Sequence, residues 1–117
     1  MNHNITVHLT ARLFAEEKCY GPGVQRLLTA VEQLHSLRSA AASMNMAYSK
    51  AWSIIRGAEQ GFGCKLLVST IGGSGGGGAT LTDEARQIMA AYDEYCRKLD
   101  EYSGALFREL FGFCTEE

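Results

Sequence analysis

The side chains of this 117-residue sequence that could bind a metal ion or act as nucleophiles are its four cysteines and three histidines. They lie far apart, with no Cys-x-x-Cys pair and no Cys/His cluster at the spacing of a zinc site. The cysteines are Cys19, Cys64, Cys96 and Cys114. Two pairs of acids, at 93–94 and 100–101, are chain neighbours that point in different directions from a helix, as on a solvated face. We therefore expect free thiols, no metal, no cofactor and no catalytic site.

A second candidate for chemistry is the glycine-rich run at 72–78, which could cradle a phosphate group. A nucleotide-binding loop would need a Gly-Lys-Ser/Thr ending and a helix directly after it, whereas the sequence Ala-Thr-Leu at 79–81 predicts a strand. Two interpretations remain: a hairpin tip whose backbone N–H groups contact DNA, or a purely structural hairpin. In the first interpretation the contacting residues are Ser74, Gly75 and Gly76.

Basic side chains are concentrated in the middle of the chain, although the formal net charge of the whole protein is −2. Residues 33–82 carry a formal charge of +3, and the remaining residues carry −5. Nucleic-acid-binding domains are usually basic, so the total charge argues weakly against such a function. The uneven distribution nevertheless leaves a basic central segment that suits an anionic partner.

The elements that would position these groups begin with an alternating segment. Between Ile5 and Leu13 apolar residues occupy every second position, which predicts a half-buried N-terminal strand. The sequence Gly-Pro-Gly at 21–23 then interrupts the chain. From Val24 to about His35 apolar residues recur at three- and four-residue intervals, which predicts a first amphipathic helix.

Two further helical patterns follow closely on each other and predict a helix-turn-helix over about 36–60. Ser36 is a suitable N-cap for the shorter helix, and Asn45 stands where a tight turn needs a left-handed backbone. The second helix is expected from about Tyr48 to Gln60. A helix in this second position can lie in the major groove of DNA.

The outer face of the second helix, together with the start of the first, carries the residues that would contact DNA. Recognition helices present their N-terminal residues to base edges, so we favour contact over an ordinary solvated face. The predicted contacts are Arg38, Ser39, Tyr48, Ser49, Lys50, Ser53 and Arg56. For Tyr48, stacking on the core and a hydroxyl bond to a phosphate both remain open. Trp52 lies on the apolar face and is predicted to be a core residue.

A hairpin at about 65–81 and a long helix at about 82–113 complete the predicted elements. A hairpin directly after a helix-turn-helix is a wing, and Thr82 followed by two acids is typical of a helix start. The long helix repeats apolar or small residues at alternating four- and three-residue spacing, and such a stripe must be covered by the core or by a second copy. The predicted homodimer interface consists of Met89, Tyr92, Cys96, Leu99, Leu106 and Leu110.

Two of these motifs together resemble those of the ModE-type transcriptional regulators. The sequence MNMAYSKAW at 44–52, preceded by SLRSAA at 36–41, is similar to their helix-turn-helix. The sequence GGSGGGGATLT at 72–82 is similar to their glycine-rich wing and to the Leu-Thr start of the next helix. The resemblance covers about 14–95, in order and without a large gap.

The resemblance implies both fold and function. The expected fold is α+β and mostly helical: a winged helix-turn-helix related to LysR-type DNA-binding domains, with an N-terminal strand, a glycine-rich wing hairpin and a long dimerisation helix. The expected function is that of a sequence-specific transcriptional regulator that binds double-stranded DNA as a homodimer. We expect one domain over 1–117, cytoplasmic and outside any membrane. Because the sequence ends at Glu117, leaving no room for the family's molybdate-binding domain, no molybdate site is expected.

The chain also departs from the family pattern, which has basic residues at three positions where this sequence has none. These positions are Val24, Ser69 and Ser74. Ala47 replaces the serine that the family has at the start of its recognition helix. Each missing phosphate contact should weaken DNA binding, and Arg38 and Arg56 could compensate. The alternative function is a winged-helix protein-interaction module with little or no DNA affinity, which the acidic ends and a pI near 5.9 favour.

Overall fold

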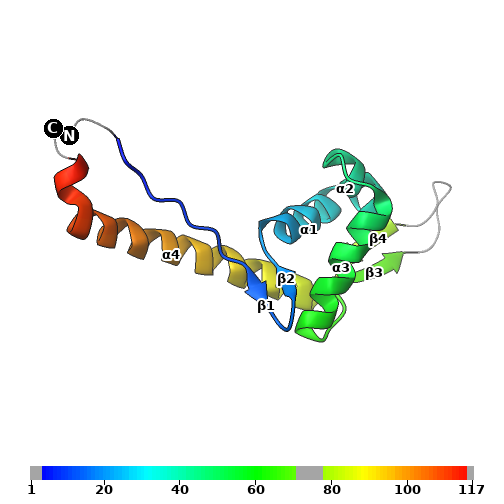
Figure 1. Cartoon of the computed structure of the whole chain (residues 1–117). Coiled ribbons are helices and arrows are strands. Elements are labelled where there is room, and N and C mark those ends of the chain that lie inside the picture. The colour runs from blue at the N-terminus through cyan, green and yellow to red at the C-terminus, as the bar shows by residue number, and fades with distance from the viewer. Residues whose placement is uncertain (1–3, 71–77, 116–117) are drawn as a thin grey trace.

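The computed structural model describes residues 4–70 and 78–115, and within them the chain is mostly helical. Four helices and two antiparallel two-stranded sheets follow one another along the described residues (Figure 1). Their bounds are β1 Leu13–Phe14, β2 Lys18–Tyr20, α1 Pro22–Leu34, α2 Leu37–Ser43, α3 Tyr48–Phe62, β3 Leu67–Thr70, β4 Gly78–Leu81 and α4 Asp83–Thr115. This is the mostly helical α+β winged helix that the sequence predicts.

Local sequence signals set the starts of the helices. Pro22 occupies the first turn of α1, where its fixed φ and missing N–H cost nothing. The Ser36 Oγ accepts the backbone N–H of Ser39 at 3.0 Å and caps α2. In the same way the Thr82 Oγ1 accepts the N–H of Ala85 at 3.0 Å and caps α4. Both caps are among the sequence predictions, and both are confirmed.

The hydrophobic core lies where α1, α3 and the start of α4 meet the two sheets. Its largest fully buried side chains are Tyr20, Leu27, Leu28, Val31, Ile55 and Leu66. The ring of Tyr20 packs edge-on against the rings of Phe62 and Tyr92, with centroid distances of 5.8 and 5.1 Å. Its hydroxyl donates to the Gln25 Oε1, and burial raises the pKa of Tyr20 above its usual value. Tyr20 is therefore a neutral, hydrogen-bonded aromatic residue within the core.

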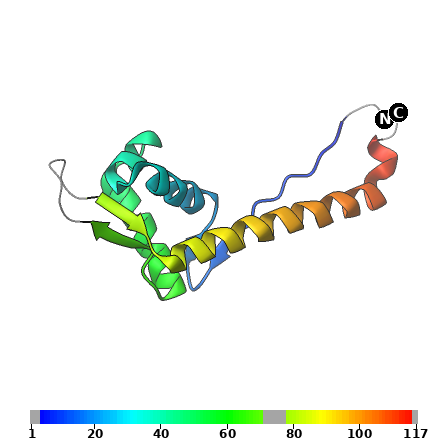
Figure 2. The ribbon, with the colours of Figure 1, turned by 180° about the vertical axis from the view of Figure 1, so that it is seen from behind.

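The predicted strand between Ile5 and Leu13 is wrong for most of its length. Positions 4–12 run extended alongside α4, and of the predicted strand only Leu13, at the start of the short β1, forms a ladder with β2 (Figures 1 and 2). A strand needs a neighbour that exchanges backbone hydrogen bonds with it, and no described strand lies beside 4–12. The end of the segment is tied to α4 by the Tyr92 hydroxyl, which donates to the Ala11 carbonyl oxygen at 2.7 Å.

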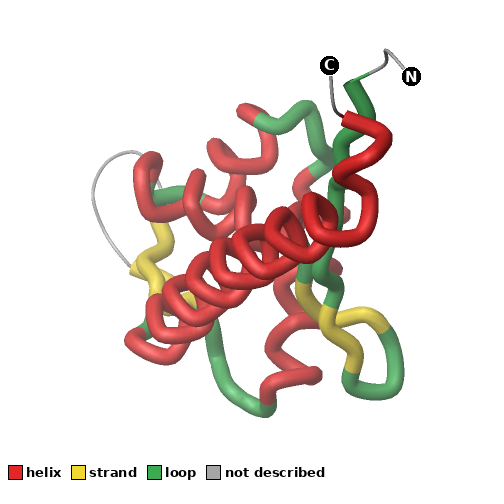
Figure 3. The backbone as a smooth tube through the Cα atoms, turned by 90° about the vertical axis from the view of Figure 1, so that its left-hand side faces the viewer, coloured by secondary structure: helices red, strands yellow, loops and turns green. Residues whose placement is uncertain are grey.

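The base of the wing is fixed to the end of α1. In the antiparallel pair of β3 and β4, Thr70 lies opposite Gly78. A Cβ atom at Gly78 would come within 2.7 Å of the Thr70 Oγ1 and 2.8 Å of the His35 carbonyl oxygen, so this position requires glycine. The next N–H, of Ala79, donates to the His35 carbonyl oxygen at 3.0 Å. Figure 3 shows the two small sheets on opposite sides of the helical body.

Helix α4 extends far beyond the rest of the molecule. The longest dimension of the chain is 61 Å, against 27 and 21 Å for the other two. The beginning of α4 packs against α1 and β4, whereas its later turns project away from the other helices (Figure 1). Although α4 has 33 residues, neither it nor any other described helix is apolar enough to cross a membrane.

Candidate nucleic-acid interface

Helices α2 and α3 are joined by a tight turn at 44–47 and form the predicted helix-turn-helix. Asn45 has a φ of 54°, which is the left-handed conformation that its residue type predicts. The N–H of Met46 donates to the Ala41 carbonyl oxygen at 2.9 Å and closes the turn. The helix-turn-helix prediction is confirmed, and α3 runs slightly beyond the predicted end, to Phe62.

The two faces of α3 differ sharply in burial. Ala51, Ile55 and Ala58 have no exposed surface and anchor the helix on the core. The predicted contacts on the other face are all exposed; they are Ser49, Lys50, Ser53 and Arg56. The start of α2 adds two more exposed predicted contacts, Arg38 and Ser39. The fold thus brings the predicted contacts of both helices to solvent-accessible positions.

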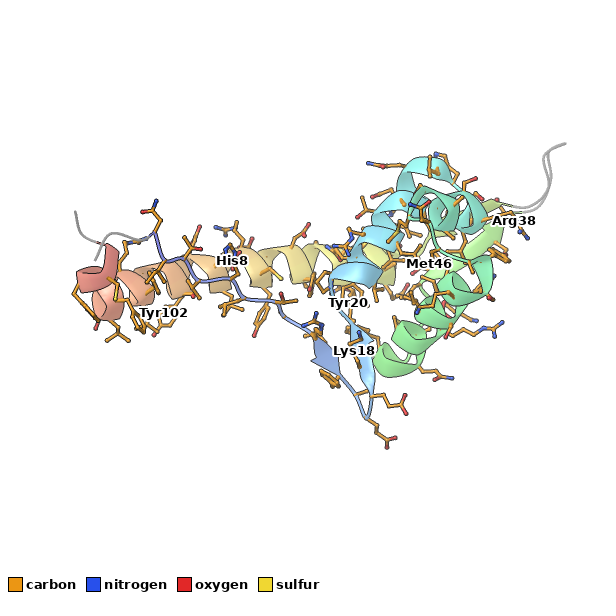
Figure 4. All side chains as sticks on the ribbon, turned by 45° about the horizontal axis from the view of Figure 1, so that its top comes forward. His8, Lys18, Tyr20, Arg38, Met46 and Tyr102 are labelled. Carbon is orange, nitrogen blue, oxygen red and sulfur yellow. The ribbon has the colours of Figure 1, made fainter. Side chains whose placement is uncertain are left out.

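Two aromatic side chains flanked by two arginines form a row along the outside of this surface. The Arg38 guanidinium lies 4.1 Å from the centroid of the Tyr48 ring, and the Arg56 guanidinium lies 5.4 Å from the Trp52 ring. The Tyr48 and Trp52 rings meet edge-on, with centroids 6.5 Å apart. Stacking restrains both arginines while their N–H groups stay available for a ligand. Figure 4 shows Arg38 at the end of the body that carries the start of α3.

The prediction that Trp52 is a core residue is wrong in part. Its side chain packs against the edge of the core but remains partly exposed. The inward direction of α3 is taken by Ala51 and Ile55, and Trp52 is one residue further round the helix, on the flank. Tyr48, for which two interpretations were open, is exposed and points its ring at Arg38 rather than into the core.

The charges of this surface are positive and largely uncompensated. Arg38, Lys50 and Arg56 have no ion pair among the described residues. Lys65, between α3 and β3, has its Nζ 3.9 Å from the Glu59 carboxylate. The other oxygen of that carboxylate accepts the backbone N–H of Leu66 at 2.9 Å, so the acid also fixes the start of the wing. The surface is therefore suited to an anion.

The remaining predicted contacts, Ser74, Gly75 and Gly76, lie outside the described residues, so their placement is not part of this surface. The strands that lead to them are described. The first N–H after the glycine run is held by the end of α1, next to the cap of α2. The base of the wing thus has a fixed position relative to the helix-turn-helix.

The six predicted interface residues of α4 fall into three groups. Tyr92 is buried in the core of its own protomer and hydrogen-bonded there. Met89, Cys96 and Leu99 are partly exposed, and the first two pack against the core edge. Leu106 and Leu110, in the projecting part, are 40% and 57% exposed. The free apolar surface therefore lies mainly beyond the middle of the helix.

Metal binding has no support in the described part of the chain. No three His, Cys, Asp or Glu side chains of the described residues come together as a metal site requires. All four cysteines are free thiols, from the buried Cys19 to the partly exposed Cys114.

Comparison with known proteins decides the family. Residues 25–86, from α1 to the first turn of α4, match the family described as "Bacterial regulatory helix-turn-helix protein, lysR family". The chain belongs to this family. Its ModE-type helix-turn-helix and wing are the part that matches, in agreement with the resemblance seen in the sequence.

Curated relatives of this lysR-family chain carry ModE names. It is 39% identical over 84 residues to "Molybdenum transport protein ModE" of Azotobacter vinelandii, covering 71% of this chain and 30% of that protein. It is 33% identical over 76 residues to the protein of the same name from Herbaspirillum seropedicae, covering 65% of this chain and 28% of that one. It is 30% identical over 89 residues to "Transcriptional regulator ModE" of Haemophilus influenzae, covering 76% of this chain and 33% of that protein. The chain thus spans no more than about a third of the length of these relatives.

Two features of this lysR-type surface are not predicted by the sequence patterns. Arg38 and Tyr48 stack only because the turn folds α2 back on α3, and no periodicity links them. The hairpin of β1 and β2 places Lys18 in a cavity that Ser53 and Gly57 of α3 also line. The one signal in the sequence is the polar interruption Glu-Glu-Lys at 16–18, which fits a turn but does not identify its neighbour.

Proposed function

We propose that this chain is a sequence-specific DNA-binding transcriptional regulator, not an enzyme, that acts as a cytoplasmic homodimer with residues 1–117 as one winged-helix domain. The observation that carries the proposal is the exposed outer face of α3, where Lys50 and Arg56 stand without an acidic partner among the described residues. Membership of a regulatory helix-turn-helix family supports DNA as the anionic partner.

The dimensions of α3 suit a recognition helix. Its 15 residues span about 22 Å at roughly 1.5 Å per residue, enough to lie along a major groove about 12 Å wide. Ser49, Lys50 and Ser53 lie in its first half and are placed to contact base edges. Arg38 and Ser39, at the start of α2, and Arg56, further along α3, are placed to contact phosphates.

The homodimer is supported by the exposed apolar stripe of α4. Leu106 and Leu110 are exposed on the part of α4 that projects beyond the other helices, where among the described residues only the extended segment 4–12 runs alongside (Figure 2). A second copy related by a two-fold axis would bury both stripes. In such a dimer the two recognition helices would enter successive major grooves of a pseudo-palindromic operator, about one helical turn apart.

A gel-shift assay on generic duplex at low salt tests the proposal. The double variant Lys50→Ala/Arg56→Ala should lose binding, because it removes both unpaired cations of α3. The matched control is Lys98→Ala/Arg108→Ala, which removes the same number of charges from the exposed side of α4 and should bind like the unmodified protein. Selection of bound sequences from a random pool then identifies the operator.

The second candidate is a winged-helix protein-interaction module. It is favoured by the absence of basic side chains at Val24 and Ser69 and by the pI near 5.9. A protein that is folded and dimeric but binds no duplex at any salt concentration would support this function and overturn the DNA-binding one.

A further inference from the structure

We propose that the DNA-binding surface extends past α3 into a basic groove between α3, the start of α1 and the β1–β2 hairpin, and that this groove holds a phosphate of the DNA backbone. The groove, here called the hairpin groove, is defined by Arg12, Lys18 and Arg26 on one side and Ser53 and Gly57 of α3 on the other. The inference rests on the proposed DNA-binding function and adds a contact region to it.

The hairpin groove has the charge and size for a phosphate. Its volume is about 270 Å³, and three cations and no carboxylate line it. The cations come from three separate segments: Arg12 precedes β1, Lys18 begins β2, and Arg26 lies in the first turns of α1. The fold therefore gathers these charges, which are dispersed in the sequence, at one place.

None of the three cations is used for internal ion pairing. Arg12, Lys18 and Arg26 are exposed and have no carboxylate partner among the described residues. By contrast, the cations at Arg86 and Arg97 each lie 2.7–2.8 Å from a glutamate oxygen. Like charges that converge without a counter-charge do not stabilise a fold, whereas they do favour an anionic ligand.

The hairpin groove is continuous with the outer face of α3. A second cavity of about 690 Å³ lies along that face, lined by Tyr48, Ser49 and Arg56 among others. Lys18, Ser53 and Gly57 line both cavities and form their common border. Glu17 is the one acid that lines the outer cavity, and it does not line the hairpin groove.

The common border is open to a close approach. A Cβ atom at Gly57 would have no other heavy atom within 4 Å, so nothing fills the space above this part of α3. Figure 4 shows Lys18 and Arg38 on opposite sides of the body that carries α3. When a helix lies in the major groove, the two backbones that border the groove pass along its sides. Lys18 and its neighbours are placed to meet one of them.

The test measures duplex affinity as a function of salt for the full chain. For Lys18→Ala/Arg26→Ala the slope of log K against log salt should fall by about 0.9, the value for one lost phosphate contact, and affinity near 100 mM salt should fall roughly tenfold. Sequence preference should stay the same, because phosphate contacts carry no base information. The charge-conserving variant Lys18→Arg/Arg26→Lys should keep the slope, and unchanged circular dichroism excludes misfolding.

The outcomes separate this inference from the proposed function. If Lys50→Ala/Arg56→Ala loses binding while Lys18→Ala/Arg26→Ala keeps the unmodified slope, the hairpin groove is not a phosphate site and DNA binding by α3 stands. A drop in slope no larger than that of Lys98→Ala/Arg108→Ala would also overturn the inference. If the unmodified protein binds no duplex, both the proposed function and the groove inference fail.

Discussion

The winged-helix body, which extends to Tyr92, and the part of α4 beyond Tyr92, here called the projecting half, differ in how their apolar side chains are covered. Every buried hydrophobic residue of the described chain lies between Cys19 and Tyr92. Beyond Tyr92 the described apolar side chains remain partly or largely exposed, including Tyr102 at 70% and Phe113 at 63%. The body covers its apolar residues with its own chain, whereas the projecting half requires another surface to cover them.

Local interactions alone stabilise the projecting half only slightly. Arg97 donates to Glu94 and Glu101 along the same helix, and the first contact lowers the pKa of Glu94 below its usual value. Pairs of this kind on a solvated helix contribute only a few tenths of a kcal/mol each. The comparison therefore indicates that the projecting half depends on tertiary or quaternary contacts, as the proposed dimer would supply.

The strongest test of this comparison is a matched truncation in each region. Ile55→Ala removes a fully buried side chain and should lower the free energy of unfolding by about 2–5 kcal/mol. Leu110→Ala, at a side chain 57% exposed in the protomer, should change it by much less under conditions that keep the chain monomeric. Urea denaturation monitored by circular dichroism measures both. Equal losses at the two positions would contradict the division into two regions.

A second test removes the apolar character of the projecting half. Leu106→Glu/Leu110→Glu should dissociate the homodimer, because two carboxylates per copy would have to be buried at the interface. Light scattering should then give the monomer mass of 12.8 kDa, against twice that value for the unmodified protein. The helical circular-dichroism signal of the body should persist. An unmodified protein that stays monomeric at every concentration would rule out the dimer.

The smallest expected effect is on the free energy of unfolding after a substitution at Tyr92, where the body meets the projecting half. Tyr92→Phe removes the hydrogen bond that ties the Ala11 carbonyl oxygen to α4 and should cost about 1 kcal/mol of unfolding free energy. The control is Tyr102→Phe. The Tyr102 hydroxyl has no hydrogen-bond partner among the described residues, so its removal should leave the free energy of unfolding almost unchanged. Thermal and urea unfolding compare the two. If both variants match the unmodified protein, the N-terminal segment is not held at this point.

The sequence predicts local features well where one residue type satisfies a local backbone requirement. Ser36 and Thr82 cap their helices, and Asn45 takes the left-handed turn, because each of these roles is decided within about three residues. Predictions that need a distant partner do less well. The alternation from Ile5 to Leu13 has the period of a strand, but the described chain provides no neighbouring strand for most of it.

By itself, the sequence determines the order and type of the helices, the helix-turn-helix and the wing, because periodicity and caps are local properties of the chain. Only the tertiary structure decides which faces are covered. It leaves Trp52 on the flank of α3, buries Tyr92 in its own protomer, and gathers Arg12, Lys18 and Arg26 around one groove. The physical reason is that burial and electrostatic proximity depend on contacts between distant segments, and these contacts exist only after the chain has packed.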